Sequence, residues 1–392
     1  MVRIAFVTET WLTATDGVVT RLRATLAELL DAGHQVLVIG PRPGAGQPAG
    51  SAVDPRVTVR TVPTVGFGFL YGGQRWGLPV PAVASHLRRY GPDVVHVVNP
   101  VFLGIAGVIA ARLDRLPLVA SYHTNVATYA GYYHLGALRP LITLVVRSLH
   151  RQAGANLATS AVGEQELFGL GVRNVQRWPP GVDLALFHPD LGPRPRGSRP
   201  VALYVGRLAA EKGLHRLRPL AAAGSGLDLV VVGDGPAYGQ LRTELGPAAR
   251  FTGVLHGEAL AHTYRAADVF VFPSTTDTLG LTMLEALASG LPVVAVDSVA
   301  SRELLTGCPA ALIVPADDPD GLAQAAAELA TLRRTDLRGD LSQAARRVAD
   351  RYGWGEATAH LLDSYAALGP AGSRGRAAPT RPPTPFRTET TS

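Results

Sequence analysis

The sequence contains a single cysteine, Cys308, and a single lysine, Lys212, among 392 residues. One cysteine cannot form a disulfide within the chain, which fits a reducing compartment. Long apolar runs are also missing, because the longest, at 101–113, is too short to cross a bilayer. The opening MVRIAFVTET starts as a strand, without the charged and apolar regions of a signal peptide. We therefore expect a cytoplasmic protein, with peripheral contact at the inner membrane face left open.

The net charge of +6 gives little support for a nucleic-acid partner. Residues 374–392 carry four arginines and one glutamate, which is +3 of that total. The rest of the chain is only mildly basic, and a phosphorylated substrate would explain this as well as nucleic acid would. We expect a small-molecule partner and no nucleic acid.

Several kinds of catalytic motif are absent from the sequence. There is no His/Cys cluster with zinc spacing, no G-x-x-x-x-G-K-[ST] and no G-x-S-x-G. Asp318 and Asp320 in DDPDG could be read as a metal-binding pair, but a polar turn before a helix is better explained as an N-cap. These searches therefore indicate no metal or cofactor site.

The hydrophobic pattern is that of alternating strands and helices. At 47% hydrophobic residues and this length, the chain suits two domains, each with its own core. Apolar strands separated by helices indicate parallel sheets covered on both faces. Strands are expected at 3–8, 35–40, 93–98, 117–124, 155–160, 175–183, 201–206, 227–233, 249–254, 268–274, 292–297 and 311–315. The fold class is therefore α/β, with two Rossmann-like, doubly wound domains facing a cleft.

The domain boundary and the ends of the helices are also readable. The Pro-, Gly- and Arg-rich stretch 187–200 predicts a linker between domains at 1–190 and 191–353. Further helices are expected after the first strand, ending near Gly33, at 138–153, within 316–350 and at 354–368. The helix at 138–153 is interpreted as facing the core, with contact to a membrane interface as the alternative. Residues 370–392 are low in complexity and expected to be disordered.

YVGRLAAEKG, at 204–213, carries the only lysine. Arg207 lies just beyond an expected strand, and Lys212 lies near the expected start of the next helix. A guanidinium fork, a compact ammonium and a helix N-terminus together could hold a diphosphate. Two solvated cations at the start of a surface helix are the alternative.

DTLGLTMLEALASG, at 277–290, places Asp277 and Glu285 eight residues apart. Gly280 is expected to open a helix, with Asp277 in the loop before it and Glu285 in its first turns. A carboxylate there can accept hydrogen bonds from vicinal ribose hydroxyls, while the backbone N–H groups at 280–282 suit phosphate or sugar oxygens. A capping acid and a solvated helical glutamate are the alternative.

Three further stretches could line the cleft. GDGPAYG, from Gly233, resembles the dinucleotide fingerprint G-x-G-x-x-G, but the spacing before its last glycine is one residue too long. No acidic residue follows about twenty positions later, so the stretch is interpreted as a tight turn. ASYHTN puts His123 at the carboxyl end of a strand, where it could serve a sugar hydroxyl or be a structural histidine. TATDGVV puts Gly17 where the backbone could approach an anion, or where a plain turn needs a glycine. His96, His134 and His188 are weaker candidates.

Together these motifs resemble those of the GT-B glycosyltransferases of family 4, which are retaining nucleotide-sugar enzymes. The resemblance covers about residues 1–366, through YVGRLAAEKG, VVVGDGP, the 266–295 stretch and GVDLALFHP. VVNPVFLG and VASYHTNVATYAGYYHLG are most similar to a branch with bacterial lipid-acting mannosyltransferases and sulfoquinovosyl transferases. The resemblance implies an N-terminal acceptor domain that the C-terminal helix completes, followed by a donor domain. It also implies a GDP-mannose-like donor and no essential metal.

The resemblance also implies roles for individual residues. Arg207 and Lys212 would hold the donor diphosphate and Glu285 the donor ribose, while His123 would stabilise the cation-like transition state. The other donor contacts that it implies are Gly17, Gly233, Val254, Asp277, Gly280 and Leu281. Asp277 replaces the usual first glutamate of E-x7-E, and Val299 and Ala300 replace a usual glycine pair, while Glu303 is retained.

Three alternatives to a GDP-mannose-dependent transferase are left open. They are a UDP-sugar transferase, a sugar-nucleotide epimerase on the same fold, and a sugar-nucleotide-binding module with weakened catalysis. The acceptor, which could be a lipid, a polyol, a thiol or a natural product, and the oligomeric state are not readable from the sequence.

Overall fold

The structure is a computed structural model that describes residues 1–9, 17–43, 54–66, 75–123, 139–190, 192, 199–222, 224–277 and 279–369. The expected disorder at 370–392 and the weak candidate His134 lie outside the described residues. Within them, no helix is both long and apolar enough to cross a lipid bilayer.

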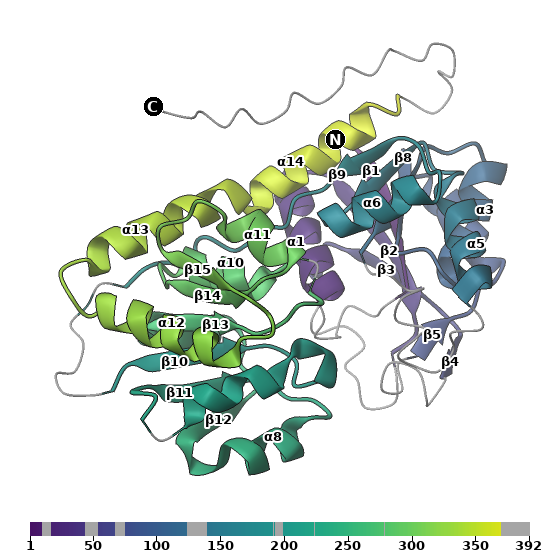
Figure 1. The fold of residues 1–392 in the computed structure, drawn as a ribbon. Coiled ribbons are helices and arrows are strands. Elements are labelled where there is room, and N and C mark those ends of the chain that lie inside the picture. Colours follow the sequence, from purple (N-terminus) through teal and green to yellow (C-terminus); the bar gives the residue numbers. More distant parts are fainter. Residues whose placement is uncertain are drawn as a thin grey trace.

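The N-terminal half is built around a seven-stranded parallel sheet of order β3-β2-β1-β6-β7-β8-β9 (Figure 1). Its strands are β1 (Arg3–Thr8), β2 (Gln35–Pro41), β3 (Thr58–Val62), β6 (Val94–Val98), β7 (Leu118–Tyr122), β8 (Ala155–Ala158) and β9 (Val175–Arg177). Its helices are α1 (Gly17–Asp31), α2 (Ala82–Tyr90), α3 (Leu103–Leu113), α5 (Arg139–His150) and α6 (Ala161–Gly169). A small antiparallel pair, β4 (Thr64–Gly66) and β5 (Arg75–Gly77), stands apart from this sheet.

Both faces of this sheet are buried, which explains why its strands are apolar without alternation. In β1, Ile4 and Phe6 pack into one hydrophobic cluster, while Ala5 and Val7 pack into the cluster on the opposite face. Successive side chains of a strand point to opposite faces, so a sheet covered twice needs apolar residues at every position.

The second half repeats the design with six parallel strands of order β12-β11-β10-β13-β14-β15. They are β10 (Val201–Val205), β11 (Asp228–Val232), β12 (Ala249–Gly253), β13 (Val269–Phe272), β14 (Val293–Val296) and β15 (Ala311–Val314). The helices are α7 (Arg218–Ala221), α8 (Tyr238–Leu245), α9 (Gly257–Ala266), α10 (Leu281–Ala288), α11 (Val299–Leu305), α12 (Pro319–Leu332) and α13 (Arg338–Ala349). Asp318 caps α12 by accepting a hydrogen bond from the Gly321 N–H, as the DDPDG turn predicts.

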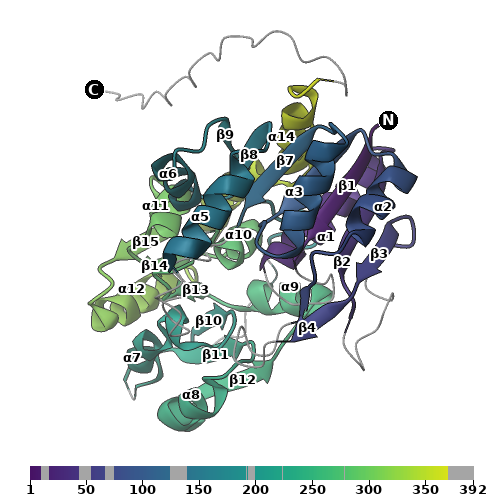
Figure 2. The same ribbon diagram turned by 90° about the vertical axis from the view of Figure 1, so that its right-hand side faces the viewer.

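The chain then returns to the first sheet through α14 (Trp354–Ala366), which packs against α1 (Figure 2). The Trp178 indole N–H donates to the Ala357 carbonyl at 3.0 Å. On the same helix, Leu361 and Tyr365 join the core cluster of the first sheet. A helix that follows the second sheet in sequence therefore completes the core of the first.

Two expectations about helices need correction. Lys212 does not precede a regular helix: it ends a 3₁₀ turn (Ala210–Lys212), and a second one (Leu214–Leu217) leads into the four-residue α7. Gly213 between them has φ of +66°, which interrupts the helical ladder, so a helix dipole at Lys212 is not supported.

The helix at 138–153 is shorter than expected and only partly core-facing. It is α5, in which Val146 and Leu149 are buried while Leu141 and Leu144 are exposed. Residues 316–350 form two helices, α12 and α13, separated by a short turn.

Candidate active site

The order of the strands identifies one place on each sheet where a ligand is expected. In the first sheet the order in which strands are added along the chain reverses between β1 and β6, and in the second sheet it reverses between β10 and β13. Ligands of such sheets bind beyond the carboxyl ends of the strands at this reversal. Gly17 follows β1, Arg207 and Lys212 follow β10, and Asp277 follows β13.

The two halves meet at the first turns of two helices. Gly17 begins α1 of the first half and Leu281 begins α10 of the second. A Cβ placed on Gly17 would lie 3.6 Å from the Leu281 Cδ1 atom. Two helix N-termini, with their unsatisfied N–H groups and partial positive charge, are therefore adjacent.

Gly280 makes the start of α10 possible. It has φ of +61°, and a Cβ there would lie 2.5 Å from Met283 Cε and 2.9 Å from Leu304 Cδ1. Only glycine fits both the left-handed backbone and the packed surroundings. The residue thus fixes the direction in which the first N–H groups of α10 point.

Lys212 and Asp277 form an ion pair between Nζ and Oδ1, in which both side chains are mostly buried. The sequence predicted both residues as site residues but not their pairing. Arg207 is exposed, and its carbonyl accepts a hydrogen bond from the Tyr204 hydroxyl at 3.1 Å. The structure therefore gathers Lys212 and Asp277 at the carboxyl edge of the second sheet and leaves the Arg207 side chain toward solvent.

The neighbouring turn after β11 brings two backbones into contact. Gly233 has φ of +135°, and a Cβ there would overlap the carbonyl oxygen of Gly206. Its N–H donates to the Gly253 carbonyl at 2.8 Å, which ties the ends of β11 and β12 together. Val254, directly after β12, is 49% exposed. The tight turn predicted for GDGPAYG is confirmed.

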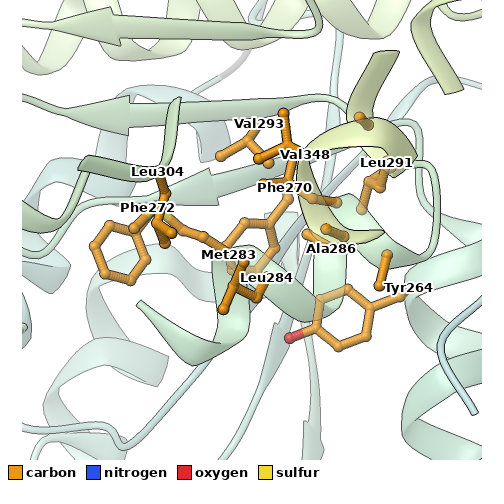
Figure 3. Packing of buried hydrophobic residues seen from close by; sticks show 14 of the residues in the cluster. Tyr264, Phe270, Phe272, Met283, Leu284, Ala286, Leu291, Val293, Leu304 and Val348 are labelled. Carbon is orange, nitrogen blue, oxygen red and sulfur yellow. The ribbon is translucent and has the colours of Figure 1, made fainter. Parts of the chain in front are cut away.

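Glu285 lies one turn into α10 and accepts a hydrogen bond from the Tyr264 hydroxyl at 2.7 Å. Figure 3 shows the Tyr264 ring at the edge of the core cluster, beside Leu284 and Ala286. Burial raises the pKa of Glu285 to about 7, and the hydrogen bond from Tyr264 offsets this only in part. Near neutral pH this carboxyl group is thus divided between its charged and neutral forms.

His123 follows β7, and only 5% of its surface is exposed. Its Nε2 atom lies 2.9 Å from the Ser121 hydroxyl, while its Nδ1 atom is buried without a hydrogen-bond partner among the described residues. Burial holds the pKa of His123 well below its usual range, and the positive charge of Arg21 adds to the effect. The imidazole is therefore neutral.

Glu9, which the sequence analysis missed, organises the reversal point of the first sheet. It is 3% exposed, and its two carboxyl oxygens accept the N–H groups of Val101, Phe102, Leu103 and Gly104 at 2.7 to 2.9 Å. The protein's own carboxylate thus occupies the N-terminus of α3. A lone glutamate after a strand carries no sequence signal for this role, because its partners are backbone groups 92 to 95 residues away.

Residues of both halves also line a narrow gap that is too small to hold a water molecule. Thr159 and Pro180 contribute from the first half, and the second half contributes Leu279, Ala300, Glu303 and Leu304. Glu303, on α11, also forms an ion pair with Arg177 of β9 across the domains. Ser298 and Ser301 form a reciprocal capping box, so Val299 and Ala300, which replace the glycine pair usual in the family, are the first two residues of a well-formed α11.

No group of three or more His, Cys, Asp or Glu side chains with metal-binding geometry occurs among the described residues. His96 belongs to a buried hydrogen-bonded network, and His188 is exposed with its Nδ1 atom 3.2 Å from the Pro189 carbonyl.

Comparison with known proteins agrees with this architecture. Residues 15–186 match the family model described as Glycosyltransferase Family 4, and residues 199–331 match the model described as Glycosyl transferases group 1. A GDP-mannose-dependent alpha-mannosyltransferase of Mycolicibacterium smegmatis is 38% identical over 80% of this chain and 85% of its own. The protein of that name from Mycobacterium tuberculosis is 35% identical over 94% of this chain and 97% of its own. Sulfoquinovosyl transferase SQD2 of Arabidopsis thaliana is 31% identical over 72% of this chain and 58% of its own.

Solved structures share the fold at low sequence identity. The sucrose-phosphate synthase of Thermosynechococcus elongatus has a TM-score of 0.76 at 22% identity, covering 94% of this chain and 99% of that one. Anabaena HepE in complex with UDP has a TM-score of 0.73 at 19% identity, covering 93% of this chain and 100% of that one. The solved structures show that the two parallel-sheet domains form a GT-B fold, and the family models and named relatives support a glycosyltransferase enzyme. The chain belongs to glycosyltransferase family 4.

Proposed function

We propose that the protein is a retaining glycosyltransferase that moves a hexose from a nucleotide diphosphate to a lipid, polyol or natural-product acceptor, with GDP-mannose as its donor. The observation that carries the proposal is the convergence of Lys212, Asp277 and the N-termini of α1 and α10 at the reversal points of both sheets. The two mycobacterial relatives named as GDP-mannose-dependent support the choice of donor.

The donor diphosphate would lie between the two helix N-termini and the side chains of Lys212 and Arg207. As the anomeric C–O bond breaks, negative charge develops on the diphosphate and positive charge on the sugar. Fixed N–H groups and cations stabilise the leaving group more strongly as its charge grows, which lowers the barrier. No metal is required for this step, because protein groups supply the positive charge.

Three residues would position the sugar and the ribose. Glu285 would accept hydrogen bonds from the ribose hydroxyls, Asp277 would contact the transferred sugar, and His123 would lie beside the anomeric centre. A neutral imidazole suits that place, since a charged one would repel the developing cation. The leaving phosphate would help to deprotonate an acceptor hydroxyl that attacks from the same face, which retains the anomeric configuration.

The donor is tested by thermal unfolding in the presence of GDP, UDP, ADP and dTDP. A nucleotide at one hundred times its Kd stabilises the protein by about 2.7 kcal/mol, which raises Tm by several degrees. We expect a selective response to GDP. A selective response to UDP would instead indicate the UDP-sugar transferase.

Turnover is tested with GDP-mannose and a panel of lipid, polyol and glycoside acceptors, with the product's anomeric configuration measured by NMR. We expect GDP release that depends on an acceptor and an α-linked product. Donor conversion without any acceptor into a different sugar nucleotide would indicate an epimerase. GDP-mannose binding without turnover across the panel would indicate a binding module.

A further inference from the structure

A chain of hydrogen bonds runs through the first domain from the C-terminal helix to His123. The Tyr365 hydroxyl on α14 lies 2.7 Å from His96 Nδ1. His96 Nε2 lies 2.8 Å from the Ser121 hydroxyl, which in turn lies 2.9 Å from His123 Nε2. All four residues are buried, with exposed fractions between 0% and 7%. Bulk water therefore has little access to the chain.

Two arrangements of the protons keep the Ser121 hydroxyl proton within this chain. In one, Tyr365 donates to His96, His96 donates through Nε2–H to Ser121, and Ser121 donates to His123 Nε2. In the other, every bond is reversed. Each arrangement leaves one buried donor without an acceptor among the described residues: the His123 Nδ1–H in the first and the Tyr365 O–H in the second. The Nδ1–H lies beyond the carboxyl end of β7, where a water or a ligand hydroxyl can accept its hydrogen bond, whereas the Tyr365 hydroxyl lies in the core cluster, so the first arrangement is favoured.

We infer that Tyr365, His96 and Ser121 are positioning residues that fix the neutral tautomer of His123 with its proton on Nδ1. The catalytic role of this tautomer rests on the proposed function, whereas the tautomer itself does not depend on it. The Nδ1 atom is the one ring nitrogen of His123 without a partner in the described part of the chain, so this tautomer leaves its N–H available to a ligand. That N–H can donate to a hydroxyl oxygen of the transferred sugar, and it carries no net charge against the developing cation.

The groups that surround the chain all oppose its protonation. The Arg21 guanidinium is completely buried and lies 3.9 Å from the centre of the Trp178 ring, whose indole also contacts the His96 and His123 rings. Burial, with a contribution from Arg21, lowers the pKa of His96 to about 3. His150 is a further buried histidine near His123 and lowers its pKa as well. A neutral chain is therefore maintained throughout the ordinary pH range.

The position of the chain links it to the site. Thr8 ends β1 and His123 follows β7, and these two strands lie on either side of β6, so the two residues are about 10 Å apart along the carboxyl edge of the sheet. Tyr365, by contrast, is on the helix that returns from the second domain. The tautomer of the site histidine thus depends on correct docking of α14.

The test is a direct observation of the tautomer by NMR of the full-length protein with 15N-labelled histidine. The His123 signals are assigned by their loss in His123→Asn. In the wild type we expect the proton on Nδ1. In Ser121→Ala, Nε2 loses its donor, so we expect a large share of the Nε2–H tautomer, and in Tyr365→Phe a smaller share. The Nε2–H tautomer in the wild type, or an unchanged tautomer in a folded Ser121→Ala, would overturn the inference.

Activity gives a second measurement, with GDP-mannose as the donor. Loss of one hydrogen bond that orients His123 should lower kcat about tenfold in Ser121→Ala and several-fold in Tyr365→Phe, with GDP affinity unchanged. Ser289→Ala, a buried serine in the second domain, and Tyr90→Phe, at the end of α2, are matched controls that should retain kcat. Equal losses in the controls would contradict a positioning role. If the wild type does not use GDP-mannose, the proposed function fails. The NMR spectra would still show which nitrogen of His123 carries the proton, and so would still test the inference.

Discussion

Glu285 should make the stability of this protein depend on pH near neutrality. Its pKa is raised by burial from 4.5 to about 7 in the folded protein, whereas in the unfolded chain it returns to its ordinary value. The folded state then binds the proton more tightly than the unfolded state does. The stabilising effect of that proton is complete below pH 4.5 and is lost as the pH rises through 7.

The size of the effect follows from the same two pKa values. A difference of about 2.5 between the two values, at about 1.36 kcal/mol per pH unit, gives about 3 kcal/mol in total, of which roughly three quarters falls between pH 5 and pH 8. Part of Glu285 remains accessible to solvent, so this value is an upper bound. Glu285→Gln keeps the shape of the side chain but removes the titration.

The assay is urea unfolding of the wild type and Glu285→Gln at several pH values between 5 and 8. Burial also raises the pKa of Glu9, and partial burial with repulsion from Asp31 and Asp183 raises that of Glu28. Their contributions cancel in the difference between the two proteins, since neither residue is changed. We expect the advantage of Glu285→Gln to grow by about 1 to 2 kcal/mol from pH 5 to pH 8. Parallel stability curves would refute the buried, proton-binding state of this carboxyl group.

Three further predictions concern the same site. If ionised Glu285 binds the ribose, GDP affinity should fall about tenfold per pH unit below pH 7; a flat affinity profile by calorimetry would contradict this. Lys212→Ala should lower kcat by about 10²–10³ with an unchanged fold by circular dichroism, and wild-type turnover would disprove its diphosphate role. Gly233→Ala should cost about 3 kcal/mol or more, because a Cβ overlaps the Gly206 oxygen. Gly239→Ala, where a Cβ meets nothing within 4 Å, is the control and should be neutral or stabilising on urea unfolding.

The repeating part of the fold is predictable because it follows from local patterns. A strand is present at each of the twelve expected places, and the first, Arg3–Thr8, has the expected bounds, but the strand expected at 175–183 is only Val175–Arg177. The edge strand β3 and the β4–β5 pair were not predicted. Thr58–Val62 contains Thr58, Arg60 and Thr61 beside its two valines, so it shows no buried apolar run. Its strand conformation follows from pairing with β2, which is a tertiary contact.

The site is predictable only where a side chain's role depends on nearby sequence. Gly280 lies at the start of its helix, as the sequence indicates, because the turn itself requires a glycine. Glu9 and Tyr365 could not be found in this way, since their partners are 92 or more residues distant. The break after Lys212 was also missed, because YVGRLAAEKG reads as a helix start unless the left-handed Gly213 is known.

The ion pair with Asp277 gives a physical reason for the single lysine in a chain that otherwise uses arginine. An ammonium has three protons directed to different sides, so one group can serve Asp277 and a phosphate oxygen at once. A guanidinium at the same place would form a planar, two-pronged pair with the carboxylate and turn its fork away from the donor. Lys212→Arg should therefore bind GDP more weakly and turn over more slowly although its charge is unchanged. Near-normal turnover would show that charge alone is sufficient, and the geometry of the pair would then be irrelevant to catalysis.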